Sequence, residues 1–253
     1  MLRKYLEIQH DMEEIENSIH VKAYVMMRQL SLSIQTFEKN YQLFKEHLET
    51  NDDFDFQIQL GTFNRNPLKW DYHYIEQETY RQLLNLVASA QSLVDHTRIL
   101  IDKVYSETEF QKEYHEKLDK ELKYHPTQRF IQKLRNYILH VQFPFVSTQF
   151  QHKRVSPLGD PDALFTASVK LTLCKKELLI WDGWKEHAKL YLEIQGELIF
   201  LDLLVDEYYL LISNFQPWLN QRQKKMHESE YLLLFKKWED LYQELERSVS
   251  AGS

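Results

Sequence analysis

Apolar residues recur every three or four positions over much of the chain, which is the spacing of one face of an α-helix. The clearest stripe runs from Met27 to Leu48 in alternating steps of three and four residues. Its members are Met27, Leu30, Ile34, Phe37, Tyr41, Phe44 and Leu48. This heptad pattern predicts one long helix over residues 22 to 49 that packs against another helix. We expect a shorter amphipathic helix before it and, from Asn51 to Pro67, a loop.

A second long helix is predicted from Tyr72 to Tyr105, with apolar residues on most of its sides. One stripe contains Leu83, Val87, Ala90, Val94, Ile101 and Val104, and the other contains Leu86, Leu93 and Leu100. Only a narrow polar edge remains, so this helix should be largely buried. A charged helix should follow from Glu107 to Lys123. Pro126 suits the first turn of the next helix, which Phe143-Pro144 should end.

The period changes to two after this helix, which is the spacing of a β-strand. Residues 165 to 173 alternate between apolar and polar side chains, and residues 146 to 155 form a plausible partner strand. The two predict a hairpin with its loop at Ser156 to Pro161. Helices should resume at 175–195, at 197–223 with a kink at Pro217, and at 228–247. The Trp181 to Trp184 run and Tyr208-Tyr209 should pack in the core or at an interface, because aromatic residues at helical spacing usually do so.

These elements predict an all-α fold: a helical bundle of residues 1–253 in one domain, with a long N-terminal helix and one inserted β-hairpin. Only 5 glycines and 6 prolines occur in 253 residues, which favours long helices. The single cysteine, Cys174, excludes an internal disulfide and a cysteine-based zinc cluster. His73 has no further ligand at a useful spacing, so we expect no metal site. Without a long apolar run or a signal sequence, a soluble, cytoplasmic protein is expected.

The charge of the chain is unevenly distributed. The net charge is −7, which argues against a protein that coats nucleic acid with a basic surface. From Leu122 to Gly159, however, there is no Asp or Glu. The cations of this segment are Lys123, Arg129, Lys133, Arg135, Lys153 and Arg154. The segment predicts a local anion site, or alternatively a region that neutralises acidic neighbours in the fold.

Within this segment, the stretch LRNYILHVQFP (Leu134 to Pro144) combines an arginine, an asparagine and a histidine. At about 100° per residue, Asn136 and His140 lie on one helix face with Arg135 at their side. Arginine binds phosphate oxygens, and histidine transfers protons near neutral pH, so the three suit metal-free cleavage of a phosphodiester. In the alternative interpretation, Arg135 pairs with a carboxylate, and Asn136 and His140 satisfy buried backbone groups. Spacing alone does not decide, because Arg3 with His10 and Arg222 with His227 fit the same rule.

The stretch resembles the HEPN superfamily, all-α proteins with a signature of Arg, four to six residues and His, usually with a polar residue after the Arg. A second similar stretch is SLVDHTRIL, Ser92 to Leu100. The resemblance covers residues 72–145 as a HEPN-like core, with helices at 175–248 completing the bundle and the hairpin at 146–173 as an insertion. It implies a metal-independent endoribonuclease, often a bacterial toxin or antiphage effector. Such enzymes are homodimers in which the Arg and His of both copies line a shared groove.

The resemblance also implies roles for particular residues. Arg135 would bind the scissile phosphate, His140 would act as general acid or base, and Asn136 would be the polar companion. RNA would be held by a wider set of basic residues: Arg129, Lys133, His152, Lys153 and Arg154. A supporting group of Asp95, His96 and Arg98 would belong to the site if its helix packs beside the motif. The charge spacing favours instead an ordinary surface ion pair.

The expected partners are RNA, a second copy of the chain and a cognate antitoxin or defence protein, with no cofactor, no metal and no membrane. Two other functions remain open from the sequence. One is a catalytically inactive HEPN-like module that binds RNA or a protein partner. The other is a subunit of a helical assembly joined through the stripe from Met27 to Leu48.

Overall fold

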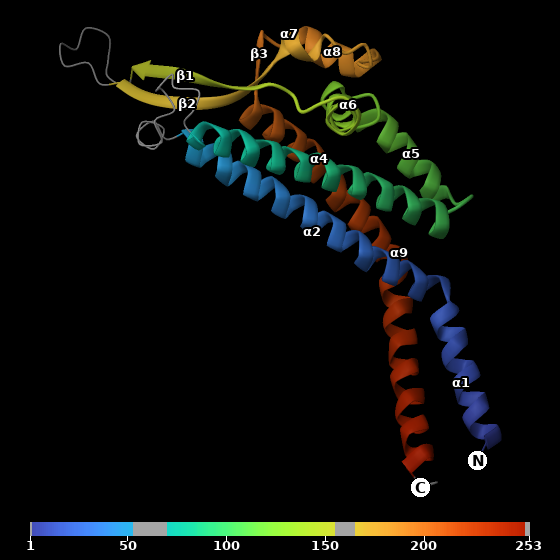
Figure 1. The fold of residues 1–253 in the computed structure, drawn as a ribbon. Coiled ribbons are helices and arrows are strands. Elements are labelled where there is room, and N and C mark those ends of the chain that lie inside the picture. Colours follow the sequence, from blue (N-terminus) through green and yellow to red (C-terminus); the bar gives the residue numbers. More distant parts are fainter. Residues whose placement is uncertain (1, 53–69, 155–164, 251–253) are drawn as a thin grey trace. The chain divides into compact units, whose positions relative to one another are not determined.

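The computed structural model describes residues 2–52, 70–154 and 165–250, which are mostly helical (Figure 1). The first helices are α1 (Leu2–Asn17), α2 (Ile19–Asp52), α4 (Trp70–Val104), α5 (Glu109–Glu121) and α6 (Pro126–His140). They are followed by β1 (Val146–Arg154), β2 (Phe165–Cys174), α7 (Lys175–Leu178), α8 (Glu186–Ile194), β3 (Leu198–Phe200) and α9 (Leu201–Ser250). The predictions of a mainly helical chain and of a hairpin after residue 145 are confirmed. Among the described helices, none combines the length and the apolar content needed to traverse a bilayer.

The heptad stripe forms the buried face of α2, as predicted. Leu30, Phe37 and Phe44 are at most 2% exposed. The helix begins after Ser18, whose hydroxyl accepts a hydrogen bond from the Val21 amide at 3.2 Å and so caps the first turn. The predicted loop after Asp52 lies mostly outside the described residues.

The chain divides into two compact units. One contains residues 1–34, 93–115 and 214–253, and the other contains residues 35–92 and 116–213. The helices α2, α4 and α9 therefore each contribute to both units. In the first unit, α9 lies against α1 and the start of α2, where Tyr24 and Tyr231 stack with ring centroids 3.6 Å apart. The second unit holds α5 residues from Glu116 on, α6, the sheet, α7 and α8.

The sheet has three antiparallel strands in the order β1-β2-β3. The pairing of β1 with β2 runs from Val146 opposite Leu173 to Arg154 opposite Phe165, so the predicted strands are confirmed. The loop predicted between them lies outside the described residues. The short strand β3 was not predicted, because residues from 197 on were expected to be helical. Ile199 is buried and pairs with Leu173, and the free edge of β2 supplies the hydrogen bonds that hold this segment extended.

Two helix predictions in the C-terminal part are wrong. The helix expected over 175–195 is two helices, α7 and α8, because the segment between them packs as a tight turn. The indole of Trp184 donates a hydrogen bond to the carbonyl of Leu178 at 2.6 Å, which satisfies the end of α7. Conversely, α9 is one helix through Pro217 and across residues 224–227, where two helices were expected. His227 is buried against the rings of His20 and Tyr105, so packing continues through the expected gap.

Candidate functional site

The motif helix α6 has one strongly apolar face and one polar face. Its buried side chains include Phe130, Ile131, Leu134, Tyr137 and Ile138. Phe130 stacks on Tyr191 of α8 at a centroid distance of 4.5 Å and on Trp184 at 5.2 Å. This packing determines which side of α6 faces outward. The aromatic runs at Trp181 to Trp184 and at Tyr208 also lie in the core, since Trp184 and Tyr208 are buried, as predicted.

The outward side of α6 carries a polar row that we call the basic stripe: Arg129, Lys133, Asn136 and His140. The steps of four, three and four residues place all four on one helix face. At 1.5 Å per residue, the stripe is about 16 Å long. The first three side chains are half-buried and His140 is exposed. The guanidinium of Arg129 donates a hydrogen bond to Gln132 at 3.2 Å.

Arg135 lies to the side of this stripe. It is about 140° around the helix from His140, because five residues separate them at about 100° each. Its Nη1 donates to Asn136 Oδ1 at 3.4 Å, and its Nε is buried with no hydrogen-bond partner among the described residues. No carboxylate pairs with Arg135 or His140 in the described part of the chain. One α6 therefore presents Asn136 and His140 together, while Arg135 lies on a different side of the helix and contacts Asn136.

One of the two other Arg and His pairs that fit the spacing rule, Arg222 with His227, differs from the motif. Arg222 forms an ion pair with Glu113, with Nη2 and Oε2 2.5 Å apart. His227 is buried, and its Nδ1 lies 3.2 Å from that of His20. The side chain of Arg3 lies outside the described residues. Arg222 and His227 thus differ from Arg135 and His140, because their side chains contact charged or aromatic side chains of other helices.

The other predicted RNA-binding residues are only partly described. His152, Lys153 and Arg154 are the last residues of β1, opposite Ala167, Thr166 and Phe165 of β2. Their side chains lie outside the described part, so their role in RNA binding stays a prediction.

The supporting group on α4 makes local contacts within its own unit. Arg98 and Asp95 form an exposed ion pair at 3.0 Å, as the charge spacing predicts. His96 Nδ1 lies 2.5 Å from the hydroxyl oxygen of Ser33 on α2. These residues belong to the first unit, whereas α6 belongs to the second.

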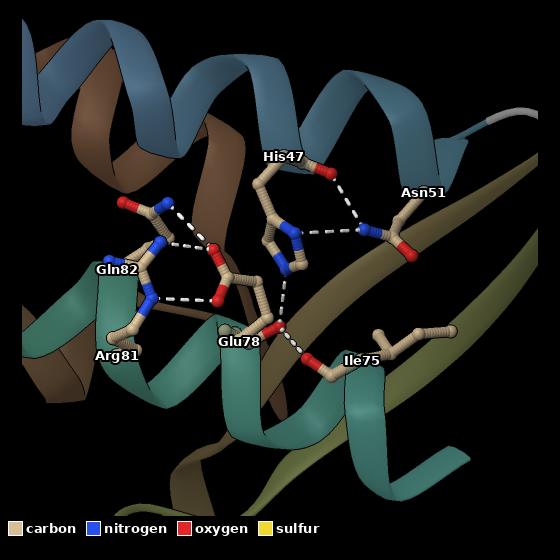
Figure 2. Close-up of polar contacts among 7 residues, drawn as sticks. His47, Asn51, Ile75, Glu78, Arg81 and Gln82 are labelled. Carbon is tan, nitrogen blue, oxygen red and sulfur yellow. Dashed lines mark hydrogen bonds and ion pairs between the residues drawn. The ribbon is translucent and has the colours of Figure 1, made fainter. Parts of the chain in front are cut away.

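Sequence reasoning missed a buried polar network at the end of α2 (Figure 2). Asn51 Nδ2 donates to the carbonyl of His47 at 2.7 Å and lies 3.2 Å from His47 Nδ1. His47 Nε2 lies 2.8 Å from the hydroxyl of Thr79, which in turn donates to the carbonyl of Ile75 at 2.7 Å. These hydrogen bonds are mutually consistent only if His47 Nδ1 is an acceptor and His47 Nε2 carries the proton. Burial lowers the pKa of His47, so this histidine is neutral and structural.

A second missed network joins β2 to α2 and α9. Lys170 Nζ lies 2.5 Å from Asp52 Oδ2 and 3.0 Å from Asp202 Oδ2. Burial lowers the pKa of Lys170, but hydrogen bonds and charge from these two carboxylates raise it above its ordinary value. A cavity of about 170 Å³ lies beside them, lined also by Lys45 and Glu49. Both lysines beside the cavity form ion pairs with carboxylates, since Lys45 Nζ lies 2.6 Å from Asp206 Oδ2. We therefore assign the network a structural role.

One group of side chains among the described residues has its possible metal-ligating atoms close together. His10, Asp11 and Glu14 on α1 have these atoms within 4.8 Å of one another, and all three residues are exposed. His10 and Glu14 are one helical turn apart, as in an ordinary surface pair. Exposed groups at this spacing are common on helix surfaces without a bound ion.

Comparisons of the chain with protein-family models, with curated proteins and with solved structures gave no match. The assignment of function therefore depends on the chemistry of the basic stripe and of Arg135 beside it.

Proposed function

We propose that this protein is a metal-independent endoribonuclease of the HEPN type that acts at α6 as a homodimer. The observation that carries the proposal is the outward placement of Asn136 and His140 on one face, within a basic stripe. The exposed imidazole has no carboxylate partner in the described residues, so it is accessible to a substrate. The role as a bacterial toxin or antiphage effector, restrained by a cognate protein, rests on the sequence resemblance alone.

The chemistry follows from the side-chain types. A ribose 2′-oxygen attacks the adjacent phosphorus and loses its proton to a neutral histidine, while a protonated histidine gives a proton to the leaving 5′-oxygen. The products are a 2′,3′-cyclic phosphate and a 5′-hydroxyl. Arginine neutralises the charge that grows on the non-bridging oxygens. In a dimer, His140 of one copy can serve as the base and His140 of the other as the acid, and where one His140 is missing, water takes over its proton transfer at a lower rate.

The position of Arg135 also favours a shared site. Because Arg135 and His140 are about 140° apart around the same helix, they leave α6 from different faces. In the proposed dimer, Arg135 of one copy binds the phosphate at which His140 of the other copy transfers the proton. This arrangement predicts complementation: a mixture of the Arg135→Ala and His140→Ala variants should recover part of the activity that each lacks alone. Without recovery, the shared site is wrong.

The direct test is cleavage of single-stranded and structured RNA in EDTA by wild type and by His140→Ala. Removal of a general acid or base should lower the rate by about 10²–10⁴-fold without loss of fold. His10→Ala, which removes an exposed histidine from α1, should leave cleavage unchanged. Equal rates in wild type and His140→Ala would exclude His140 from the mechanism.

One observation favours a second candidate, a catalytically inactive module that binds RNA or a protein partner. Arg135 contacts Asn136 and keeps its Nε buried, which is also expected of an arginine with a structural role. This alternative predicts that the wild type cleaves no RNA, and that Arg135→Ala lowers stability.

A further inference from the structure

An exposed apolar segment follows the basic stripe directly. Val141, Phe143 and Phe145 are 48%, 46% and 55% exposed, and Pro144 between the phenylalanines is buried. We call residues 141–145 the aromatic segment. Apolar side chains exposed together in this way are typical of a binding surface. The segment begins one residue after His140, at the C-terminal end of α6.

Phe143 is held in a defined orientation. Its ring stacks on that of Tyr80 from α4, with centroids 4.9 Å apart and planes 26° apart. The hydroxyl of Tyr80 donates a hydrogen bond to a carboxylate oxygen of Glu76 at 2.8 Å, which fixes the Tyr80 ring of the stacked pair. One side of Phe143 is therefore supported while nearly half of the residue stays open to solvent. Such a ring is a preorganised surface on which a further flat group can stack.

The charge of the surrounding sequence selects the kind of ligand. The segment lies within residues 122–159, which contain no acidic residue, and Arg129, Lys133 and Arg135 precede it on α6. Aromatic rings beside a cationic track are the usual elements of a site for single-stranded nucleic acid, because the bases stack and the phosphates follow the cations. Bases inside a duplex are not available for stacking on a protein ring.

We propose that the aromatic segment and the basic stripe together bind single-stranded RNA, with a base stacked on Phe143 and phosphates along Arg129 and Lys133. The inference rests on the proposed function, which makes the ligand RNA. It adds that the RNA is single-stranded and that Phe143 recognises a base. Phe143 is a binding residue in this proposal and takes no part in proton transfer.

The test measures binding without cleavage. A fluorescein-labelled 2′-O-methyl oligouridine of about ten nucleotides is titrated with protein, and the anisotropy gives Kd. The blocked 2′-oxygen cannot attack, so the result does not depend on catalysis. Phe143→Leu should weaken binding roughly 5- to 150-fold, the equivalent of the ~1–3 kcal/mol of one stacked base. Phe143→Tyr keeps the ring and should bind as the wild type does.

Phe235→Leu on α9 is the matched control, because Phe235 is 44% exposed and lies in the other unit. Its Kd should equal that of the wild type.

The proposal is overturned if Phe143→Leu binds as tightly as Phe143→Tyr, if a duplex of 2′-O-methyl RNA with the same length binds equally well, or if the wild type does not bind. Absence of binding by the wild type would favour a protein as the partner of the aromatic segment. Binding that depends on Phe143 in a protein without cleavage activity would support this inference and contradict the proposed nuclease.

Discussion

At the scale of single residues, Gly183 is constrained by its neighbour Trp181. A Cβ atom at this position would lie 2.1 Å from Trp181 Cζ2, far inside van der Waals contact. The indole has little room to move, because it packs against Trp184 and Tyr137 with centroid distances of 5.0 and 5.5 Å. The absence of a side chain at residue 183 therefore permits the turn between α7 and α8.

Gly183→Ala should lower the free energy of unfolding by about 1–3 kcal/mol, the usual cost of overpacking a filled site. The midpoint of urea unfolding measures the effect. Gly196→Ala is the control, since the nearest atom to its added Cβ would be 4.0 Å away and no loss is expected. Equal midpoints for the two variants would contradict the tight packing of Trp181 on Gly183.

His47 makes stability depend on pH. Burial lowers its pKa, more strongly than the charge of Glu78 raises it. The unfolded chain binds a proton near pH 6.5, whereas the folded protein binds it only at a lower pH. Below about pH 6.5 the unfolded state thus holds more protons, and the free energy of unfolding falls as the pH falls. Burial also lowers the pKa of His227, which acts in the same direction.

His47→Gln should therefore lose less stability than the wild type between about pH 7.5 and about pH 5.5. The glutamine amide can still donate to Thr79, but it does not titrate. Urea unfolding of both proteins across this range gives the two slopes. Parallel slopes would show that His47 does not titrate differently in the two states.

At the scale of elements, Lys170 connects three of them. It lies on β2 and pairs with Asp52 at the end of α2 and with Asp202 in the first turn of α9. These side chains are only 19% to 29% exposed, so the carboxylates are not fully solvated if the lysine is removed. The ion pair therefore contributes more than a surface pair does.

Lys170→Met should lower the free energy of unfolding by about 1–3 kcal/mol, because two partly buried carboxylates lose their hydrogen-bond donor. Lys189→Met is the control: its pair with Glu193 is long, at 3.8 Å, and more than half exposed, so almost no change is expected. Thermal unfolding of both variants at low salt compares them. A loss in Lys189→Met as large as that in Lys170→Met would contradict the difference in burial.

At the scale of the whole molecule, the net charge is −7, so the acid-free segment 122–159 is the part of the chain that favours RNA contacts most. Each phosphate contact to a single strand adds about −0.7 to the slope of log Kobs against log salt. The three cations Arg129, Lys133 and Arg135 predict a slope of about −2, and the participation of Lys153 and Arg154 would make it about −3.5. Anisotropy titrations at several salt concentrations measure it. A slope near zero would contradict electrostatic binding of RNA at this face.

Much of the helical framework could be predicted from the sequence, because the period of apolar residues is a local property. The stripe from Met27 to Leu48 identified α2, and the alternation over 165–173 identified β2. The basic stripe was also visible in part, since Asn136 and His140 are one turn apart on any helix. The short strand β3 could not be predicted, because three residues carry no reliable period and their hydrogen bonds come from β2.

The sequence by itself determined where most helices form, where the hairpin forms and which residues share the outward face of α6, because neighbours within a turn or a strand encode these features. The tertiary structure decided which polar groups meet. His47 lies 32 residues from Thr79, and Lys170 lies 118 residues from Asp52. It also placed Phe143 on Tyr80 and ended α7 at the carbonyl that Trp184 satisfies. Such contacts depend on the packing of distant segments, and no local pattern of hydrophobic and polar residues specifies them.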